Sequence, residues 1–226
     1  MVWQSAVVAV VGYLAGAIPI GWIVGKLLRG VDVRDYGSGA TGATNVLRTL
    51  GPRPFLFVLV ADALKAYIPV LAIWYIFEPH EGATAAQNLQ ATAAVAAIIG
   101  HDWPVYIGFR GGRGVAATYG AFAAMLFPLS VGLVVAAILI VLTFRYMSLM
   151  SLTTVPLGGI ALLVLALTGI VPYAYAVFGG LAAVLVLLRH RANIQRLLAG
   201  TEPKMGRGGT RRTPRIGQKP RPFHRM

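Results

Sequence analysis

The sequence predicts an all-α polytopic membrane protein with about seven transmembrane helices, and three observations support this prediction. Of its 226 residues, 57% are hydrophobic and only 12% are charged, and the mean hydropathy is +0.72. A soluble domain has about a quarter of its residues charged. Several apolar runs are long enough to cross a hydrocarbon core of about 30 Å, which takes roughly 20 helical residues.

The apolar runs follow one another along the chain, and polar connections separate them. The first has no basic region before it, so we expect a retained span and not a cleaved signal peptide. Its glycines at four-residue spacing favour close helix packing. The fourth run is short because Pro128 ends it, and runs four and five are alternatively one long kinked helix. We expect a loop over residues 78–90. The expected spans are residues 6–28, 55–77, 91–107, 115–127, 129–144, 149–168 and 172–188.

The distribution of cations predicts the orientation of the spans. With seven spans every Lys and Arg falls on one side of the membrane, whereas the connections near 78–81, Pro128 and 169–172 contain none. By the positive-inside rule the cationic side is cytoplasmic, which places the N-terminus outside and the C-terminus in the cytoplasm. We expect the polar connections on this side to be short re-entrant or interfacial loops.

Composition also divides the chain and excludes some chemistry. Residues 204–226 are basic, rich in Gly and Pro and poor in aliphatic side chains, so we expect a disordered cytoplasmic tail after a transmembrane domain, residues 1–203. Beside a bilayer the tail is expected to contact anionic lipid headgroups, and it lacks the series of aromatics typical of nucleic-acid binding. The absence of cysteine excludes disulfides and thiol catalysis, and the four histidines are scattered, so no metal or cofactor is expected.

The stretch from Gly100 to Thr118 joins two apolar runs and contains the tetrapeptide Gly111-Gly112-Arg113-Gly114. Glycines allow the backbone to approach a ligand closely, and the following helix begins with unpaired N–H groups at the positive end of its dipole. With Arg110 and Arg113 this turn is a candidate phosphate site. The alternative is a tight turn between helices with arginines that extend to the membrane surface.

A second polar segment, residues 36–51, is dense in glycine, hydroxyl and amide groups and ends in an arginine. We expect its backbone N–H groups and polar side chains to line a pocket. The guanidinium of Arg48 would donate two hydrogen bonds to a phosphate there. The side chains are those of Ser38, Thr41, Thr44 and Asn45. The alternative is an interfacial loop in which Thr44 or Asn45 caps a short helix.

Two smaller clusters lie near the same ends of the spans. Asp62 and Lys65 share one helix face within a span, and such charges pair with each other or face a cavity. Ser148 and Ser151 begin the sixth span, where they either cap the helix or contact a ligand.

The last cluster, residues 189–202, forms a short amphipathic helix in which His190 and Asn193 point the same way. A histidine there could bind phosphate or move a proton near neutral pH. The alternative is that His190 is an isolated histidine near a helix end, with no functional role. Together the clusters converge on one membrane face and share a preference for anions. They indicate a cytosolic ligand that carries phosphate, with an apolar groove between helices for a chain.

These residues resemble the signature segments of a known family, the bacterial acyl-phosphate:glycerol-3-phosphate acyltransferases of the PlsY type. The resemblance covers residues 6–203. The sequence departs from the family pattern at Ala40, Ala66, Arg113 and Ala117, where the family usually has Asn, Gly, Lys and Thr. The matching positions are Gly37-Ser38-Gly39 and residues 42–48, Asp62 and Lys65, Gly100-His101, Pro104, Phe109 and residues 111–116, Ser148 and Ser151, and His190, Asn193, Ile194, Arg196, Leu197, Gly200 and Glu202.

The resemblance implies a bacterial inner-membrane enzyme with its active site facing the cytoplasm. It would transfer a fatty acyl group from acyl phosphate to the 1-hydroxyl of glycerol 3-phosphate, giving lysophosphatidic acid and phosphate. We expect a monomer that uses no cofactor and binds no nucleic acid. Because acyl phosphate is already activated, we expect direct attack by the hydroxyl, with His190 or the substrate's own phosphate as proton acceptor.

The polar clusters and the resemblance together give the expected site residues. Those expected to be catalytic are His190, Ser38 and Arg113. Those expected to bind substrate are Ser38, Thr44, Asn45, Arg48, Lys65, His101, Arg110, Gly111, Gly112, Arg113, Gly114, Ser148, Ser151, His190 and Asn193.

Two other functions fit parts of the sequence. A transporter or channel for a phosphorylated metabolite also places arginines and helix ends along its path, but the polar segments here lie at one surface and show no paired repeat. A scaffold that acts through its basic tail explains the tail and not the clusters. Deletion of residues 204–226 distinguishes these two hypotheses, since an enzyme should remain active without the tail and a scaffold that acts through the tail should not.

Overall fold

The computed structural model describes residues 2–205, and this part of the chain is built from helices. It contains no strand, so the predicted all-α class is confirmed for these residues. The first helices are α1 (Val2–Ala17), α2 (Ile20–Arg29), η1 (Val33–Asp35), α3 (Ala43–Leu50), α4 (Pro52–Glu81), α5 (Ala83–Asp102) and η2 (Val105–Ile107). The rest are α6 (Val115–Met125), α7 (Phe127–Phe144), α8 (Met147–Leu167), α9 (Tyr173–Arg189) and α10 (Arg191–Leu198).

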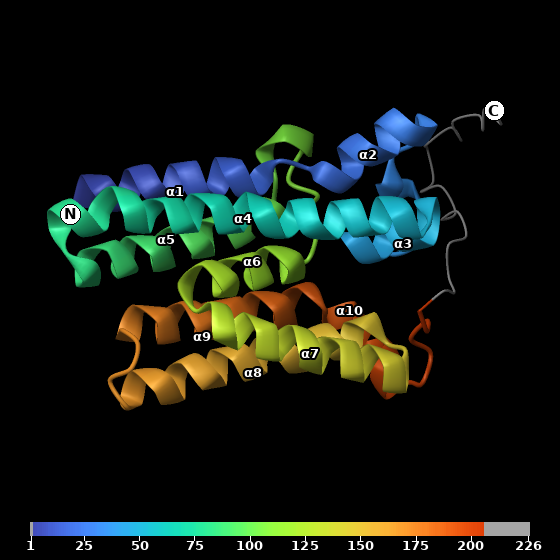
Figure 1. The fold of residues 1–226 in the computed structure, drawn as a ribbon. Coiled ribbons are helices and arrows are strands. Elements are labelled where there is room, and N and C mark those ends of the chain that lie inside the picture. The colour runs from blue at the N-terminus through green and yellow to red at the C-terminus, as the bar shows by residue number, and fades with distance from the viewer. Residues whose placement is uncertain (1, 206–226) are drawn as a thin grey trace.

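The helices form two groups with α6 between them (Figure 1). One group is α1, α4 and α5, and the other is α7, α8 and α9. The short helices α2, α3 and α10 lie at one end of the bundle, together with the turn between α7 and α8, on the right of Figure 1. The turns from α4 to α5 and from α8 to α9 lie at the opposite end and contain no Lys or Arg.

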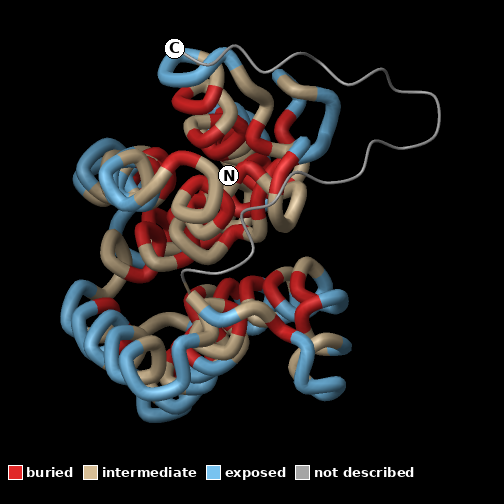
Figure 2. Tube along the Cα trace, turned by 90° about the vertical axis from the view of Figure 1, so that its right-hand side faces the viewer, coloured by how far each residue is buried: buried red, intermediate tan, exposed pale blue. Residues whose placement is uncertain are grey.

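Several of these helices suit a membrane. In the described chain four helical segments are long and apolar enough to cross it, namely Val2–Arg29, α4, α7 and α8, and the pair α9 and α10, bent by 64°, makes a fifth. Buried positions face the interior, whereas the outward faces of the peripheral helices are exposed (Figure 2), and many exposed residues there are Leu, Val and Ile. Lipid-facing surfaces are apolar, so these helices are suited to cross a membrane, and the count of seven spans stays a prediction.

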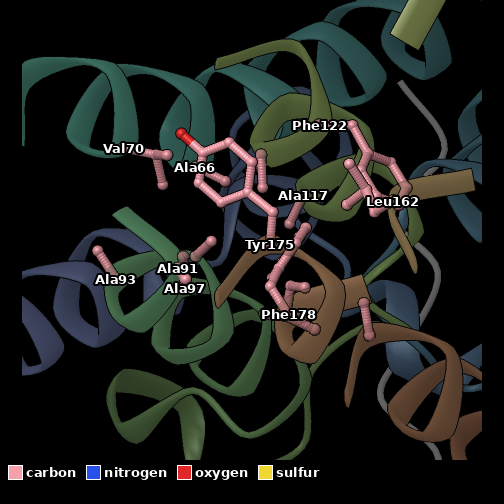
Figure 3. Packing of buried hydrophobic residues seen from close by; sticks show 14 of the residues in the cluster. Ala66, Val70, Ala91, Ala93, Ala97, Ala117, Phe122, Leu162, Tyr175 and Phe178 are labelled. Atoms are coloured by element: carbon pink, nitrogen blue, oxygen red, sulfur yellow. The ribbon is translucent and has the colours of Figure 1, made fainter. Parts of the chain in front are cut away.

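Small residues bring the inner helices close together. A Cβ atom on Gly16 of α1 would lie 2.0 Å from the carbonyl oxygen of Ala97 in α5, so only glycine fits there. The close packing predicted from the spaced glycines is therefore present. Figure 3 shows the neighbouring core, where Tyr175 reaches from α9 towards Val70 of α4. Its hydroxyl donates to Gln90 Oε1 at 2.5 Å and satisfies a buried amide within the helices.

Two expected features of the spans differ in the structure, and a third is confirmed. The loop predicted over residues 78–90 is wrong, because α4 continues to Glu81 and α5 begins at Ala83, with only Gly82 between them. Alanines there favour a helix more than the neighbouring amides oppose it. The first span is broken after Ala17, where Pro19 supplies no N–H for a continuing helix. The fourth and fifth runs are two separate helices, α6 and α7, and not one kinked helix.

The first two residues of the predicted tail contact the turn between α7 and α8. Met205 N–H donates to the carbonyl oxygen of Arg145, and the Lys204 ammonium lies 5.6 Å from the ring centre of Tyr146. The boundary after residue 203 stays a prediction. The rest of the predicted tail lies outside the described residues.

Candidate active site

A pocket lies between the two groups of helices, towards the end that carries α3 and α10. Its empty volume is about 680 Å³ when the open solvent at its mouth is included. One wall is lined by Ser38, Ala40, Gly42, Ala43, Thr44, Asn45, Arg48, Phe55, Leu59, Asp62, His101, Arg113, Val115 and Ala116. The other wall is lined by Met147, Ser148, Met150, Ser151, His190, Asn193 and Glu202. Segments far apart in sequence therefore meet at one cavity.

Two guanidinium groups in this pocket lack an ionic partner. Arg48 extends from the last turn of α3 and Arg113 from the turn before α6, and neither forms a hydrogen bond or ion pair with another described residue. Burial lowers the pKa of both side chains, that of Arg113 to about 10, so both remain protonated at neutral pH. The charge of Glu202 in the same pocket offsets theirs only in part, because it forms its salt bridge with Arg196, and partly buried cations without a close counter-charge are costly. The pocket therefore favours a bound anion.

The imidazole of His190 faces the same pocket in a defined protonation state. His190 lies between α9 and α10, and its Nδ1 is 2.8 Å from the carbonyl oxygen of Val186. A carbonyl only accepts, so we assign the proton to Nδ1 and leave Nε2 as an acceptor. Burial, reinforced by the Arg113 guanidinium, lowers the pKa of His190 to about 4. A neutral ring with a free Nε2 is suited to accept a proton.

A buried carboxylate, Glu202, organises the second wall. Its Oε1 accepts from Ser148 Oγ at 2.7 Å and from Asn193 Nδ2 at 2.6 Å, and its Oε2 accepts from Arg196 Nε at 2.7 Å. Burial alone would raise its pKa, but these donors hold the pKa of Glu202 below its usual range. Glu202 therefore joins the start of α8 to α10 and to the segment that follows α10.

Asn45 has a comparable organising role in the first wall. Its Nδ2 donates to the carbonyl oxygens of Val33 at 2.7 Å and Ala40 at 2.8 Å, and its Oδ1 accepts from Ser38 N–H at 2.9 Å. The amide is thus occupied in holding the loop before α3. The Asn45 side chain positions Ser38, whose hydroxyl has no hydrogen-bond partner among the described residues.

The charges beneath the first wall are matched. Lys65 Nζ lies 2.8 Å from Asp62 Oδ1 and donates to the carbonyl oxygen of Ile18 at 2.8 Å. His101 Nδ1 lies 3.6 Å from the same carboxylate oxygen. The cluster connects α4 with α5 and with the break between α1 and α2. Lys65 therefore sits behind Asp62, which lines the pocket, and does not line the pocket itself.

The glycine turn is built differently from the predicted phosphate cradle. Gly111 N–H donates to the carbonyl oxygen of Asp102 at 3.2 Å, and Gly112 N–H donates to that of His101 at 2.9 Å. These two N–H groups therefore bond within the protein, and phosphate binding by the turn stays a prediction. A Cβ atom on Gly112 would lie 1.9 Å from His101 Nε2, so glycine is needed there for packing.

The pocket collects most of the predicted site residues. Those that line it are Ser38, Thr44, Asn45, Arg48, His101, Arg113, Ser148, Ser151, His190 and Asn193. Gly111, Gly112 and Gly114 lie behind the lining, and Arg110 is exposed outside it. Three helices begin at the cavity, with Ala43 and Thr44 of α3, Val115 and Ala116 of α6, and Met147 and Ser148 of α8 in its lining. The first turn of a helix has N–H groups without a partner inside the helix.

Sequence reasoning did not include Glu202 among the site residues, although one signal was present. Glu202 is the only acidic residue after Asp102, in a strongly basic part of the chain. The apolar side of the pocket was also not assigned to particular residues. It is formed by Phe55, Leu59, Val115, Met147 and Met150.

Comparisons with known proteins agree with this geometry. The family model for glycerol-3-phosphate acyltransferase matches residues 6–200. A glycerol-3-phosphate acyltransferase of Halalkalibacterium halodurans is 44% identical over 196 residues, covering 86% of this chain and 92% of the relative. One of Trichormus variabilis is 39% identical over 227 residues, covering 93% and 97%.

Two crystal structures have a similar fold. That of PlsY (YgiH), an integral membrane glycerol 3-phosphate acyltransferase, in its glycerol 3-phosphate form has a TM-score of 0.79 and 34% identity, covering 89% of this chain and 96% of that one. Its lysophosphatidic acid form has a TM-score of 0.76 and 33% identity, covering 89% and 95%.

Proposed function

This chain belongs to the glycerol-3-phosphate acyltransferase family, and we propose that it acylates the 1-hydroxyl of glycerol 3-phosphate with an acyl phosphate as donor. Membrane glycerol-3-phosphate acyltransferase is the activity that its relatives and the fold support. The alternative of a transporter for a phosphorylated metabolite is not favoured by these relatives.

One observation carries the proposal for the site. Arg48 and Arg113, two protonated guanidiniums without a carboxylate partner among the described residues, face one pocket with the neutral imidazole of His190. A phosphate dianion would supply the missing counter-charge through forked, charge-assisted hydrogen bonds. The hydroxyl of Ser38 and the open turn of α6 would add donors to the same anion.

We assign the proton transfer to the opposite wall. The oxygen of the 1-hydroxyl bonds to the acyl carbon as the bond from that carbon to the phosphate oxygen breaks, and inorganic phosphate leaves. The hydroxyl proton passes to Nε2 of His190 or to the substrate's own phosphate. A bound phosphate raises the proton affinity of the nearby imidazole. Catalysis then consists of positioning and charge stabilisation, with no covalent enzyme intermediate.

The apolar side of the pocket is suited to the acyl chain. Phe55 and Leu59 of α4 face Met147 and Met150 of α8 across the cavity. Flexible methionines fill and adapt to irregular apolar space. The chain would extend from here between the helices, while the phosphates remain at the cationic end.

We propose a membrane arrangement from the same elements. The crossings are α1 with α2, α4, α5, α6, α7, α8 and α9, and α6 with its preceding turn is partly re-entrant because 11 residues span only about 16 Å. The end with α3 and α10 faces the cytoplasm of a bacterial inner membrane, since the opposite turns carry no Lys or Arg. The protein acts as a monomer, and its basic tail contacts anionic lipid headgroups.

The donor can be tested directly with purified protein. Glycerol 3-phosphate is incubated with palmitoyl phosphate or with palmitoyl-CoA, and lysophosphatidic acid and free phosphate are both measured. We expect equal amounts of the two products with palmitoyl phosphate and none with palmitoyl-CoA. Product that forms with palmitoyl-CoA and not with palmitoyl phosphate would refute acyl phosphate as the donor. Phosphate release that does not depend on glycerol 3-phosphate would refute glycerol 3-phosphate as the acceptor.

A further inference from the structure

We propose that Arg189 is a positioning residue for this reaction, which fastens the turn that carries Arg113 to the helix end that carries His190. The proposal rests on the proposed function, because it assigns those two residues to phosphate binding and proton transfer. Arg189 is the last residue of α9, and His190 follows it directly.

Arg189 reaches across from the second group of helices to the glycine turn of the first. Its Nε and Nη2 both donate to the carbonyl oxygen of Gly112, at 3.1 Å and 2.6 Å. The guanidinium lies 5.1 Å from the ring centre of Trp103, and its Nε is 4.0 Å from Asp102 Oδ2. One side chain therefore holds the end of α5 and the turn immediately before Arg113.

These contacts distinguish Arg189 from Arg48 and Arg113, which form no salt bridge with another described residue and face the pocket. Its Nε lies near the buried side chain of Asp102, its guanidinium lies over the ring of Trp103, and two of its donors are used by Gly112. It does not line the pocket, whereas Arg48 and Arg113 do. Arg189 is thus placed to act through its neighbours and not on the substrate.

The contact between Arg189 and Gly112 joins the two groups of helices beside the pocket. Within the part of the chain that the structure describes, Tyr175 of α9 also bonds to Gln90 of α5, and Tyr119 of α6 bonds to Thr154 of α8. At the level of the pocket Arg189 sets the spacing between the phosphate-facing guanidinium and the imidazole. On the other side the turn rests on His101, whose ring excludes any side chain at Gly112. A small change in such spacing costs a reaction much more than it costs binding, since a displacement of about 1 Å can reduce the rate about 100-fold.

The test compares Arg189→Ala and Arg189→Lys with the wild type in the palmitoyl phosphate assay. We expect kcat of Arg189→Ala to fall about 10–100-fold, with KM for glycerol 3-phosphate changed less than about threefold. Lysine keeps the charge beside Asp102 but cannot form the forked contact or stack in the same way, so its kcat should be intermediate. Added guanidinium ion should restore part of kcat in Arg189→Ala, because it can occupy the vacated position.

Arg191→Ala is the matched control, since Arg191 is exposed two residues away; it should retain wild-type kcat. Thermal unfolding of each variant establishes that it is folded. Unchanged kcat in Arg189→Ala, a rise in KM with kcat unchanged, or a loss that neither lysine nor guanidinium ion relieves would each overturn the proposal. An inactive wild type would instead refute the proposed function, and this inference with it.

Discussion

The two walls of the pocket come from different halves of the chain and supply different chemistry. The first wall carries Arg48 and Arg113, which form no salt bridge with any described residue, although the charge of Glu202 offsets theirs in part. The second wall carries one charged lining residue, Glu202, which is already paired with Arg196. Its other polar groups are uncharged hydroxyls, an amide and the imidazole of His190.

This difference indicates a division of labour between binding and proton transfer. An unopposed cation is stabilised by an anion, so the first wall should determine affinity for phosphate. An oriented neutral imidazole offers a proton acceptor, so the second wall should determine turnover. Changes in the first wall should mainly alter KM, and changes in the second should mainly alter kcat.

The largest effect is expected for His190→Ala. General base catalysis contributes about 10²–10⁴-fold, so kcat should fall by that factor while KM for glycerol 3-phosphate changes little. His80→Ala, at the exposed far end of α4, is the control. Steady-state kinetics with palmitoyl phosphate measure both constants. Undiminished kcat would remove His190 from proton transfer and assign that role to the substrate's phosphate.

A smaller effect, on the other kinetic constant, is expected for Arg48→Ala. A hydrogen bond to a charged group contributes about 1.5–3 kcal/mol, so KM for glycerol 3-phosphate should rise about 10–100-fold. The exposed Arg53 at the start of α4 provides the control Arg53→Ala. If kcat falls and KM does not change, the assignment of binding to the first wall is wrong.

Glu202→Gln should show a weaker effect, chiefly on stability. The loss of charge weakens three hydrogen bonds and should lower the free energy of unfolding by about 1–3 kcal/mol. The folded pKa of Glu202 is below the model-peptide value of 4.5, so its stabilisation is present above pH 4.5 and is lost as pH falls through the folded pKa. Thermal unfolding of wild type and variant should therefore differ at pH 7 and converge below pH 4.5. A difference that persists unchanged in acid would contradict this account.

The smallest effect is expected for removal of residues 206–226. The contacts of Lys204 and Met205 remain, so kcat and KM should stay within about twofold of wild type, as for a surface change away from the site. A comparison with a cut before Lys204 shows what those two residues contribute. Loss of activity on removal of residues 206–226 would instead favour the hypothesis of a scaffold that acts through its tail.

The helical membrane fold could be predicted because hydropathy and charge are local properties that can be read directly from the sequence. Length and apolar composition identified α4, α7 and α8, and spaced glycines predicted the contact between α1 and α5. The start of α5 was missed, because a loop was predicted over residues 78–90. In the fold the side chain of Gln90 is satisfied by the carbonyl oxygen of Val70 and by Tyr175. Such partners come from other helices, and local sequence does not reveal them.

The site residues were predicted by type, and what they do depends on their partners. Arg48, Arg113 and Arg189 are alike in sequence, but Arg189 has Asp102 and Gly112 beside it and the other two face an open pocket. Asn45 was expected to contact substrate, but loop carbonyls occupy its amide. The glycine turn was expected to bind phosphate, but its N–H groups bond to the end of α5. Only three-dimensional proximity distinguishes a free donor from one already used.

The central claim is that Arg48 and Arg113 hold one phosphate together. Calorimetric titration with glycerol 3-phosphate of the wild type, Arg48→Ala, Arg113→Ala and the double variant tests it. Groups that share a ligand are coupled, so the double variant should differ from the sum of the single losses by about 0.5–3 kcal/mol. Losses that add within about 0.5 kcal/mol would mean that the two arginines act on separate sites, and would contradict the account.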